Sequence, residues 1–307
     1  MKISDIISSQ SRPFPSLEIV PPLKGVSKKE LLDSIRPFME FNPPFINVTS
    51  HRDEFEFRQE GDGSFSRHLV RRRVSETAVC AAIQAEFDVE VVPHLICGGA
   101  GAEEIESRLN DFKFLGIENI MALRGDCLTG EKRFTPEPGG YSYASELVSA
   151  IKDFESKSGA DFCVGVGAYP EKHFEAPNLD ADIDNLKKKV DAGAAYIITQ
   201  MFFDNEKFYA FRQKCRDKGI TVPIIPGLKP LSTVRQTELL PRSFSLDIPQ
   251  ELVGAMKNAA SKEEAYKIGQ EWCSQQCLDL LKHDVPAVHF YTMGRPENVV
   301  EILRRHF

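Results

Sequence analysis

One acidic residue stands inside an apolar run near the start of the sequence. Glu18 lies between Leu17 and Ile19 in the run Leu17–Val20, whose aliphatic and β-branched composition is typical of a buried strand. A buried carboxylate costs free energy unless it is paired or used in chemistry. Burial also raises the pKa of a carboxyl group and keeps it protonated near neutral pH, which suits a general acid. The other interpretation is a structural Glu18 paired with a lysine or an arginine.

Polar side chains also stand at or near the ends of the other apolar runs. They are Thr49 and His51, His94, Arg124 and Asp126, Tyr169 and His173, Gln200 and Asp204, and Tyr291 and Arg295. Taken singly they have structural explanations: His94 as a hydrogen-bonded core histidine, Arg295 in a surface ion pair and Asp204 as a helix N-cap. Brought together on one face of a fold, they would form a site rich in hydroxyl, amide and guanidinium groups, with Glu18 as its acid.

The sequence lacks the patterns of two common kinds of active site. It has no serine, histidine and aspartate arranged around a nucleophile elbow. His94 and Cys97 have no second pair of ligands at zinc spacing, so we expect no metal. The glycine-rich segment Cys97–Gly101 precedes a helical pattern, but its spacing differs from a dinucleotide-binding fingerprint. Such a site fits a bound organic cofactor that carries the reactive chemistry.

Eight short apolar runs, bounded by turn residues, are predicted to be the strands that position these groups. They are Leu17–Val20, Phe45–Thr49, Val89–Leu95, Asn119–Leu123, Phe162–Tyr169, Tyr196–Phe203, Val222–Pro226 and Ala287–Thr292. Most are continuously apolar, which is typical of parallel strands buried on both faces. Helical patterns alternate with them. Ser27–Glu30 forms a capping box, and apolar stripes end at Gly116, Gly193 and Gly219, where C-cap glycines are expected.

This alternation predicts an α/β fold, a closed (β/α)8 TIM barrel that forms a single domain over residues 1–307. The segment Leu231–Asp284, between the seventh and eighth strands, is long enough for two or three extra helices. The turns from helix to strand are short, whereas two connections from strand to helix, Ser50–His68 and Asp126–Ser142, are expected to be long polar loops. Long loops on one face mark the C-terminal ends of the strands as the active end.

The composition is that of an ordinary globular protein with an acidic balance. Of the 307 residues, 42% are hydrophobic and 27% are charged, and the net charge of −7 argues against a nucleic-acid partner. The basic run Arg71–Arg73, placed at the start of a helical pattern, is either a solvated face or a phosphate-binding patch. We expect a cytoplasmic location and no membrane span, because no long apolar run or secretory signal is present and the seven scattered cysteines fit reduced thiols.

Nine short pieces follow one another over nearly the whole chain in an order that is specific when taken together. They are Leu17–Pro22, Asn47–Thr49, Pro93–Cys97, Ala122–Asp126, Ala168–Glu171, Asp191–Ala194, Ile198–Gln200, Ile225–Gly227 and His289–Thr292. Any one of them alone would be a weak signal. Together they resemble the methylenetetrahydrofolate reductases, in particular the catalytic barrel of the bacterial type. The resemblance implies a barrel that binds FAD.

The resemblance also implies a ping-pong reaction. NADH or NADPH gives a hydride to FAD and leaves, and 5,10-methylenetetrahydrofolate then takes its place. Glu18 corresponds to the general acid that protonates N10 and opens the five-membered folate ring, so that the hydride yields 5-methyltetrahydrofolate for methionine synthesis. Asp126 corresponds to a carboxylate near the pyrimidine end of the flavin, where its negative charge would make the reduced flavin a better hydride donor.

Binding residues follow from the same resemblance. Gln200, Gln236 and Arg295 correspond to folate-binding positions. The FAD-binding positions are Thr49, His94, Arg124, Gly125, Asp126, Tyr143, Ala144, Tyr169, His173, Ala176, Asp182, Asn185, Lys188 and Lys189. Leu240 departs from the pattern, because some relatives have a stacking aromatic residue there. The resemblance is compatible with a homo-oligomer. Because the sequence ends at Phe307, it implies no appended regulatory domain and no control by S-adenosylmethionine.

Two other functions stay open. A Schiff-base aldolase or lyase on the same barrel would need a desolvated lysine inside a strand, and none of the eight predicted strands contains one. A non-catalytic barrel that binds folate or flavin would keep the fold without using Glu18 as an acid. Borohydride trapping with a carbonyl substrate tests the first alternative, and a turnover assay tests the second.

Overall fold

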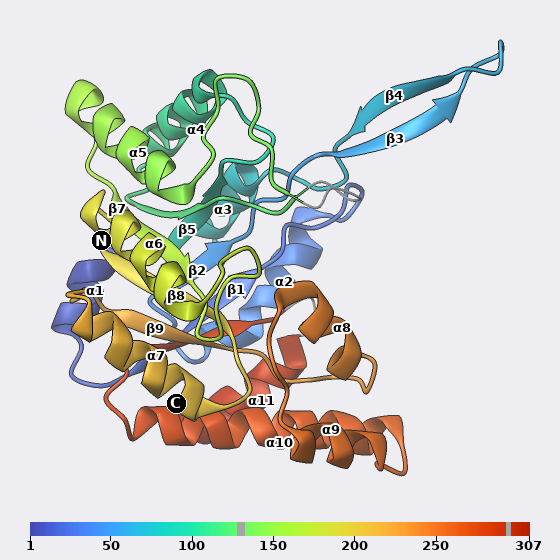
Figure 1. Cartoon of the computed structure of the whole chain (residues 1–307), viewed down its shortest axis with the longest axis vertical. Helices are drawn as coiled ribbons and strands as arrows, with labels where there is room; N and C mark the ends of the chain where they lie inside the picture. Colours follow the sequence, from blue (N-terminus) through green and yellow to red (C-terminus); the bar gives the residue numbers. More distant parts are fainter. Residues whose placement is uncertain (128–132, 293–295) are drawn as a thin grey trace.

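The computed structural model describes residues 1–127, 133–292 and 296–307. Its parallel strands close into a barrel in the order β1-β10-β9-β8-β7-β6-β5-β2 (Figure 1). The barrel strands are β1 (Phe14–Ile19), β2 (Phe45–Val48), β5 (Glu90–Ile96), β6 (Asn119–Leu123), β7 (Cys163–Ala168), β8 (Tyr196–Met201), β9 (Ile224–Leu228) and β10 (Ala287–Tyr291). The ring closes at β1, where Glu18 is in register with both Tyr291 of β10 and Asn47 of β2. The predicted TIM barrel is confirmed.

Helices alternate with the strands and cover the outside of the barrel (Figure 1). They are α1 (Ile3–Ser9), α2 (Lys28–Met39), α3 (Glu76–Gln84), α4 (Ala102–Phe114), α5 (Ala144–Ser158), α6 (Leu179–Asp191), α7 (Asn205–Asp217), α8 (Gln236–Phe244), α9 (Gln250–Lys257), α10 (Lys262–Leu281) and α11 (Pro296–His306). The extra helices predicted between the seventh and eighth barrel strands are α8, α9 and α10. Outward-facing strand residues such as Leu17 share one core cluster with helix residues such as Phe112 and Phe208.

The helix caps predicted at Ser27, Gly116, Gly193 and Gly219 are confirmed. Ser27 caps α2, because its side chain accepts a hydrogen bond from the Glu30 amide at 3.2 Å and the Glu30 carboxylate accepts one from the Ser27 amide at 2.8 Å. Gly116, Gly193 and Gly219 follow α4, α6 and α7 with positive φ angles of 70°, 118° and 72°. This left-handed conformation is unfavourable for other residues, so these glycines end the helices and start the short turns into the next strands.

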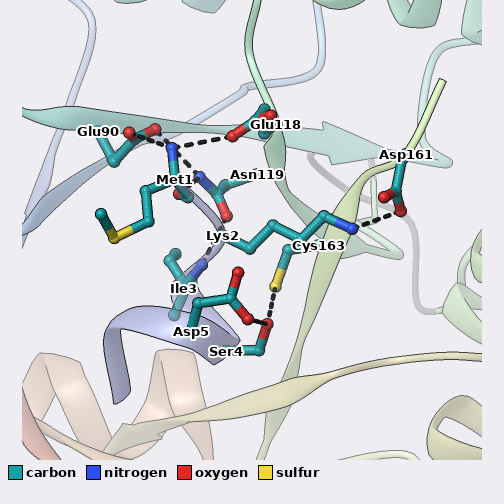
Figure 2. Close-up of polar contacts among 10 residues, drawn as sticks. All are labelled: Met1, Lys2, Ile3, Ser4, Asp5, Glu90, Glu118, Asn119, Asp161 and Cys163. Carbon is teal, nitrogen blue, oxygen red and sulfur yellow. Dashed lines mark hydrogen bonds and ion pairs between the residues drawn. The ribbon is translucent and has the colours of Figure 1, made fainter. Parts of the chain in front are cut away.

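The N-terminal segment closes the end of the barrel opposite the strand C-termini (Figure 2). The Asn119 side chain accepts a hydrogen bond from the Ile3 amide and donates one to the Met1 carbonyl, both at 2.9 Å. Lys2 forms an ion pair with Asp161 at 2.5 Å. Apolar side chains of α1 pack in one cluster with inward-facing residues from the beginnings of the strands. A site inside the barrel therefore opens at the other end, where the strands finish.

The structure corrects the prediction of a polar loop over Ser50–His68. This connection contains an antiparallel hairpin of β3 (Glu54–Gln59) and β4 (Phe65–Val70), which form a separate two-stranded sheet. Apolar and polar residues alternate from Glu54 to Arg58 of β3 but not along β4, and the tight turn between the strands includes Gly63 at a φ of +84°. The hairpin projects from the barrel (Figure 1).

The basic run Arg71–Arg73 does not start a helix, contrary to prediction. It joins β4 to α3, which begins later, at Glu76. Arg71 pairs with Asp53 at 2.8 Å, and Arg72 pairs with two glutamates of β3. These carboxylates offset the charges of Arg71 and Arg72 and hold the base of the hairpin, whereas Arg73 donates to the Pro21 carbonyl at 2.7 Å. These contacts favour a structural role for the run over a phosphate-binding patch.

Candidate active site

A cavity of about 1410 Å³ opens at the C-terminal ends of the barrel strands. Usual small-molecule sites occupy roughly 300–1,000 Å³, so this one has room for a large cofactor and a second molecule. The predicted site residues that line it are Glu18, Thr49, His94, Arg124, Gly125, Asp126, Tyr143, Ala144, Tyr169, His173, Ala176, Asp182, Asn185, Lys188, Lys189 and Gln200. The structure does not bring Gln236 to this cavity, and Arg295 lies outside the described residues.

Glu18 occupies the inner wall of the cavity. Side chains alternate along β1, so Leu17 and Ile19 point outward into the core against the helices, while Glu18 points into the barrel. Burial raises the pKa of Glu18 from its ordinary value of 4.5 to about 8. At neutral pH the carboxyl group therefore carries a proton, as the sequence predicts for a buried acid.

His94 is a titratable neighbour of Glu18. Its Nε2 lies 3.6 Å from Oε2 of Glu18 and 3.2 Å from Nδ2 of Asn47. Burial, assisted by the nearby His51, lowers the pKa of His94 to about 3. The two shifts describe one state, in which a protonated carboxyl group faces an uncharged imidazole. No ion pair with His94 forms near neutral pH, so this neighbour does not hold Glu18 in its ionised form.

Arg124 and Asp126 follow β6 and face the cavity on either side of Gly125. Gly125 has a φ of +84°, and a Cβ there would lie 3.3 Å from the Cβ of Ile96. Both observations require glycine at this bend. The Arg124 guanidinium pairs with Glu175. The charge of Asp126 reaches the neighbouring side chains, because it contributes to raising the pKa of Tyr169.

Tyr169 and His173 form the aromatic part of the cavity wall beyond the end of β7. Their rings meet edge to face with 4.8 Å between centroids. Burial raises the pKa of Tyr169 to about 12 and, together with the charge of Arg124, lowers the pKa of His173 to about 4. Both side chains are therefore uncharged at neutral pH. The carboxylate of Asp182 on α6 holds this segment by accepting a hydrogen bond from the His173 amide at 2.8 Å.

Helix α6 adds cations to the same side of the cavity. Lys189 donates to the Gly167 carbonyl at 2.7 Å, and burial lowers its pKa to about 8. Lys188 donates to the Asn185 side chain at 3.0 Å. With Arg124, these two lysines give a partly desolvated cationic rim, which suits a phosphate-bearing ligand. The residues present therefore fit a long dinucleotide cofactor, whose phosphates these lysines could hold.

The predicted folate-binding glutamines have different positions. Gln200 on β8 lines the cavity, and its Oε1 accepts a hydrogen bond from the Met201 amide at 2.9 Å. This contact fixes the amide group and leaves its Nε2 able to donate. The Oε1 of Gln236 accepts from the Ser232 amide at 2.6 Å, which anchors the start of α8 instead. Leu240 is buried in an apolar cluster with Met201, so it does not line the cavity either.

Two cavity residues escaped the sequence predictions. Asn47 lies beside Glu18 and contacts His94, although it was recognised only as part of a short motif. His289 on β10 is fully buried; its Nδ1 lies 2.9 Å from the Ser16 hydroxyl, and burial lowers its pKa to about 3. Both could have been predicted from the alternation of side chains along a strand. Asn47 shares the inward face of β2 with Thr49, and His289 shares that of β10 with Tyr291.

One lysine lies closer to a strand than predicted. The seventh barrel strand is Ile224–Leu228 rather than Val222–Pro226, so Lys229 directly follows it and is buried. Lys229 does not line the cavity, and its charge instead affects Cys273 on α10. Among the described residues, the lysines that line the cavity are Lys24, before α2, and Lys188 and Lys189 of α6.

The described residues show neither a group of His, Cys, Asp or Glu that could hold a metal ion nor a helix long and apolar enough to cross a membrane.

Comparisons with known proteins agree on one family. The sequence model of the methylenetetrahydrofolate reductase family matches residues 2–306. The 5,10-methylenetetrahydrofolate reductase of Escherichia coli K12 is 34% identical over 283 residues, which cover 92% of this chain and 86% of that protein. Methylenetetrahydrofolate reductase (NADH) 1 of Arabidopsis thaliana is 31% identical over 316 residues, covering 99% of this chain and 50% of the plant protein. The chain thus spans about half the length of its plant relative.

Solved structures agree with the fold. A protein from Clostridium thermocellum that binds two copies of 5-methyl-5,6,7,8-tetrahydrofolic acid aligns with a TM-score of 0.62. The alignment covers 99% of this chain and 98% of that protein at 13% identity, so this likeness concerns the fold alone. The match of the family model over nearly the whole chain, with the bacterial relative above 30% identity, shows that the chain belongs to the methylenetetrahydrofolate reductase family.

Proposed function

We propose that this protein is a flavin-dependent enzyme that reduces 5,10-methylenetetrahydrofolate to 5-methyltetrahydrofolate with NADH or NADPH. Membership of the family supports the substrate and the product. The observation that carries the mechanism is the acid Glu18, whose raised pKa of about 8 keeps it protonated inside the cavity at neutral pH. A cytoplasmic location is part of the proposal, because the seven cysteines, all among the described residues, form no disulfide, as in a reducing compartment.

The cofactor in this proposal is FAD. When bound, it supplies hydride transfer from the reduced nicotinamide to the folate. Lys188 and Lys189 would hold its phosphates, together with Arg124 at the end of β6, because these cations line one side of the cavity. An anionic ligand there would raise the pKa of Lys189 from about 8 back towards its ordinary value, so binding and full protonation of this lysine favour each other.

Glu18 is the proposed proton donor. It would give its proton to N10 of the folate, which opens the five-membered ring and leaves an electrophilic carbon on N5 for the hydride. The neutral His94 beside it neither withdraws this proton nor stabilises the ionised carboxylate. The acid is therefore ready before substrate arrives, as general acid catalysis at neutral pH requires.

Asp126 and Gln200 are proposed to act on charge and orientation. The Asp126 carboxylate at the cavity mouth would favour movement of a hydride away from the cofactor and stabilise positive charge on the folate. Gln200, with its Oε1 held by the Met201 amide, would present its Nε2 to the pterin ring. Gln236 and Arg295 remain proposed folate contacts. Gln236 would need to release the Ser232 amide to reach the substrate.

Lys189 gives a specific reason to test the Schiff-base alternative. It is a cavity lysine with a pKa lowered to about 8, which is the property that an amine nucleophile needs. Its Nζ is, however, directed to the Gly167 carbonyl at 2.7 Å, which favours the ammonium form. Borohydride treatment with pyruvate or a simple aldehyde should leave the mass of the protein unchanged. A stable adduct on Lys189 would support the aldolase instead.

The test of the proposed function is the visible spectrum of the purified protein. It should be yellow, or become so after reconstitution with FAD, and NADH or NADPH should bleach it under anaerobic conditions. Protein that takes up no flavin would refute the proposal. If NADH bleaches the flavin but the protein forms no 5-methyltetrahydrofolate, the protein is a flavin-binding barrel that acts on another substrate.

A further inference from the structure

The hairpin of β3 and β4 has one strongly apolar face. Cross-strand pairs place Phe55 beside Leu69, Phe57 beside Arg67 and Gln59 beside Phe65. Because side chains alternate across a strand, these residues share one side of the ribbon. Its other side carries Glu54, Glu56, Arg58, Ser66 and His68. We call the hairpin the ribbon, and we call the side with Phe55, Phe57, Phe65 and Leu69 its apolar face.

The apolar face is open to solvent in the single chain. Phe57 is 70% exposed, Phe65 66% and Leu69 54%. Phe55 is 36% exposed, because the Arg67 guanidinium lies over its ring at 3.3 Å from the centroid. The ribbon extends away from the barrel rather than over it (Figure 1), and among the described strands β3 and β4 pair with each other alone. An isolated two-stranded hairpin is marginal in water, and a contiguous exposed apolar face marks an interaction surface.

Charge excludes two classes of partner. The turn at the tip carries Glu60 and Asp62, whereas Glu54 and Glu56 of β3 are paired with Arg72 at the base of the hairpin. An acidic tip is repelled by anionic lipid head groups and by nucleic acid, so the exposed rings are not suited to either surface. The apolar face itself carries no carboxylate, and its one cation, Arg67, is engaged with Phe55. A partner surface should therefore be apolar and free of unpaired charge.

The apolar face of a second copy of this chain is such a surface, because it is apolar and its one cation is engaged with Phe55. We propose that the apolar face is a dimerisation surface, on which the ribbon of a second copy of this chain stacks about a two-fold axis. A phenylalanine side chain presents about 200 Å² when fully exposed, so the three rings at their observed exposures offer roughly 340 Å² per copy and about 700 Å² per pair. Leu69 and the rim of the ribbon bring the total towards the roughly 1,000 Å² of a stable interface.

Dimerisation through the ribbon would act near the active site. Phe55, Phe57 and Arg67 border the same cavity as Glu18. A second ribbon seated on them covers the outer rim of this opening, and two-fold symmetry makes the contact reciprocal. The inference concerns association alone, so it stands or falls separately from the proposed reaction.

The experiment compares molar masses by light scattering on gel filtration and by sedimentation equilibrium. The double variant Phe57→Asp/Phe65→Asp places two charges on the apolar face. Phe114→Asp is the matched control, since Phe114 is 90% exposed at the end of α4, outside the ribbon. We expect wild type and the control to have the same mass, twice the 34.5 kDa chain or a larger multiple, and the ribbon variant to have half of it.

A wild-type protein that stays at 34.5 kDa at micromolar concentration would overturn the proposal. So would a ribbon variant that keeps the wild-type mass, or a control that loses it equally. Circular dichroism should show that both variants retain the wild-type helical signal. As a second arm, Phe65→Cys should form a disulfide-linked dimer under mild oxidation, while Phe114→Cys should not. Equal cross-linking of both cysteines would count against a specific ribbon contact.

Discussion

Replacing Glu18 with glutamine tests the proton donor without changing the shape of the cavity. The pKa of about 8 means that roughly nine-tenths of the protein carries the Glu18 proton at pH 7, whereas an ordinary carboxyl group would carry it in under about 1% of molecules. Glutamine has nearly the same volume and can donate a hydrogen bond, but it cannot transfer a proton. General acids contribute about 10²- to 10⁴-fold, which corresponds to about 3–5 kcal/mol of barrier.

The assay separates the two half-reactions by anaerobic stopped-flow absorbance. Reduction of the flavin by NADH should stay within about twofold of wild type in Glu18→Gln, because this step needs no proton from the acid. Reoxidation by 5,10-methylenetetrahydrofolate should slow by about 10²- to 10⁴-fold. Glu155→Gln is the matched control, since Glu155 is also a poorly exposed glutamate but lies on α5 away from the cavity. If the variant reoxidised at the wild-type rate, Glu18 would not be the acid.

The rate at which the folate reoxidises the wild-type flavin should fall as the pH rises through about 8, where Glu18 loses its proton. If another group supplied the proton, the rate measured by stopped flow would not change across this pH range. Native Glu18 keeps its proton to about pH 8 while the unfolded chain releases it near pH 4.5, so the free energy of unfolding of the wild type falls as the pH rises between these values. Glu18→Gln should therefore be more stable in urea than the wild type by up to about 3 kcal/mol at pH 7. A difference in stability that does not shrink towards pH 5 would contradict the raised pKa of Glu18. Lys189→Gln should weaken FAD binding about tenfold or more in a fluorescence titration, and unchanged affinity would remove this lysine from the phosphate site. Gly125→Ala should lower the free energy of unfolding in urea by about 1–2 kcal/mol because its φ is +84°, and unaltered stability would show that the bend tolerates a side chain.

The sequence predicts the barrel well because each of its signals is local. Continuously apolar runs are typical of strands buried on both faces, and helix caps such as Ser27 and Gly116 are read from a few neighbouring residues. Cavity residues at the strand ends are predicted for the same reason, since in a barrel any residue at the end of a parallel strand reaches the same rim. Those away from the strand ends, such as Lys188 and Lys189 on α6, were expected only from the family resemblance. Glu18 needs only its apolar neighbours to be recognised as a buried acid.

The prediction errors arise where contacts between residues distant in the sequence determine the local structure. The ribbon looks like a polar loop because charged residues separate its apolar ones, and only the cross-strand pairing of Phe55 with Leu69 reveals two strands. The first strand begins earlier than predicted, at Phe14, because the segment from Phe14 to Ser16 pairs in register with the last barrel strand, starting at Ala287. The anchoring of Gln236 by the Ser232 amide likewise depends on the turn geometry and not on residue type.

Reoxidation of the NADH-reduced protein is the most direct measurement of the proposed activity. The protein would be bleached anaerobically with NADH, freed of nicotinamide and mixed with 5,10-methylenetetrahydrofolate, and the flavin absorbance and the folate products would both be recorded. The flavin colour should return with 5-methyltetrahydrofolate formed in an equal amount. A flavin that stays bleached, or one that regains its colour without any 5-methyltetrahydrofolate, would contradict a reductase that carries hydride from nicotinamide to folate through this cavity.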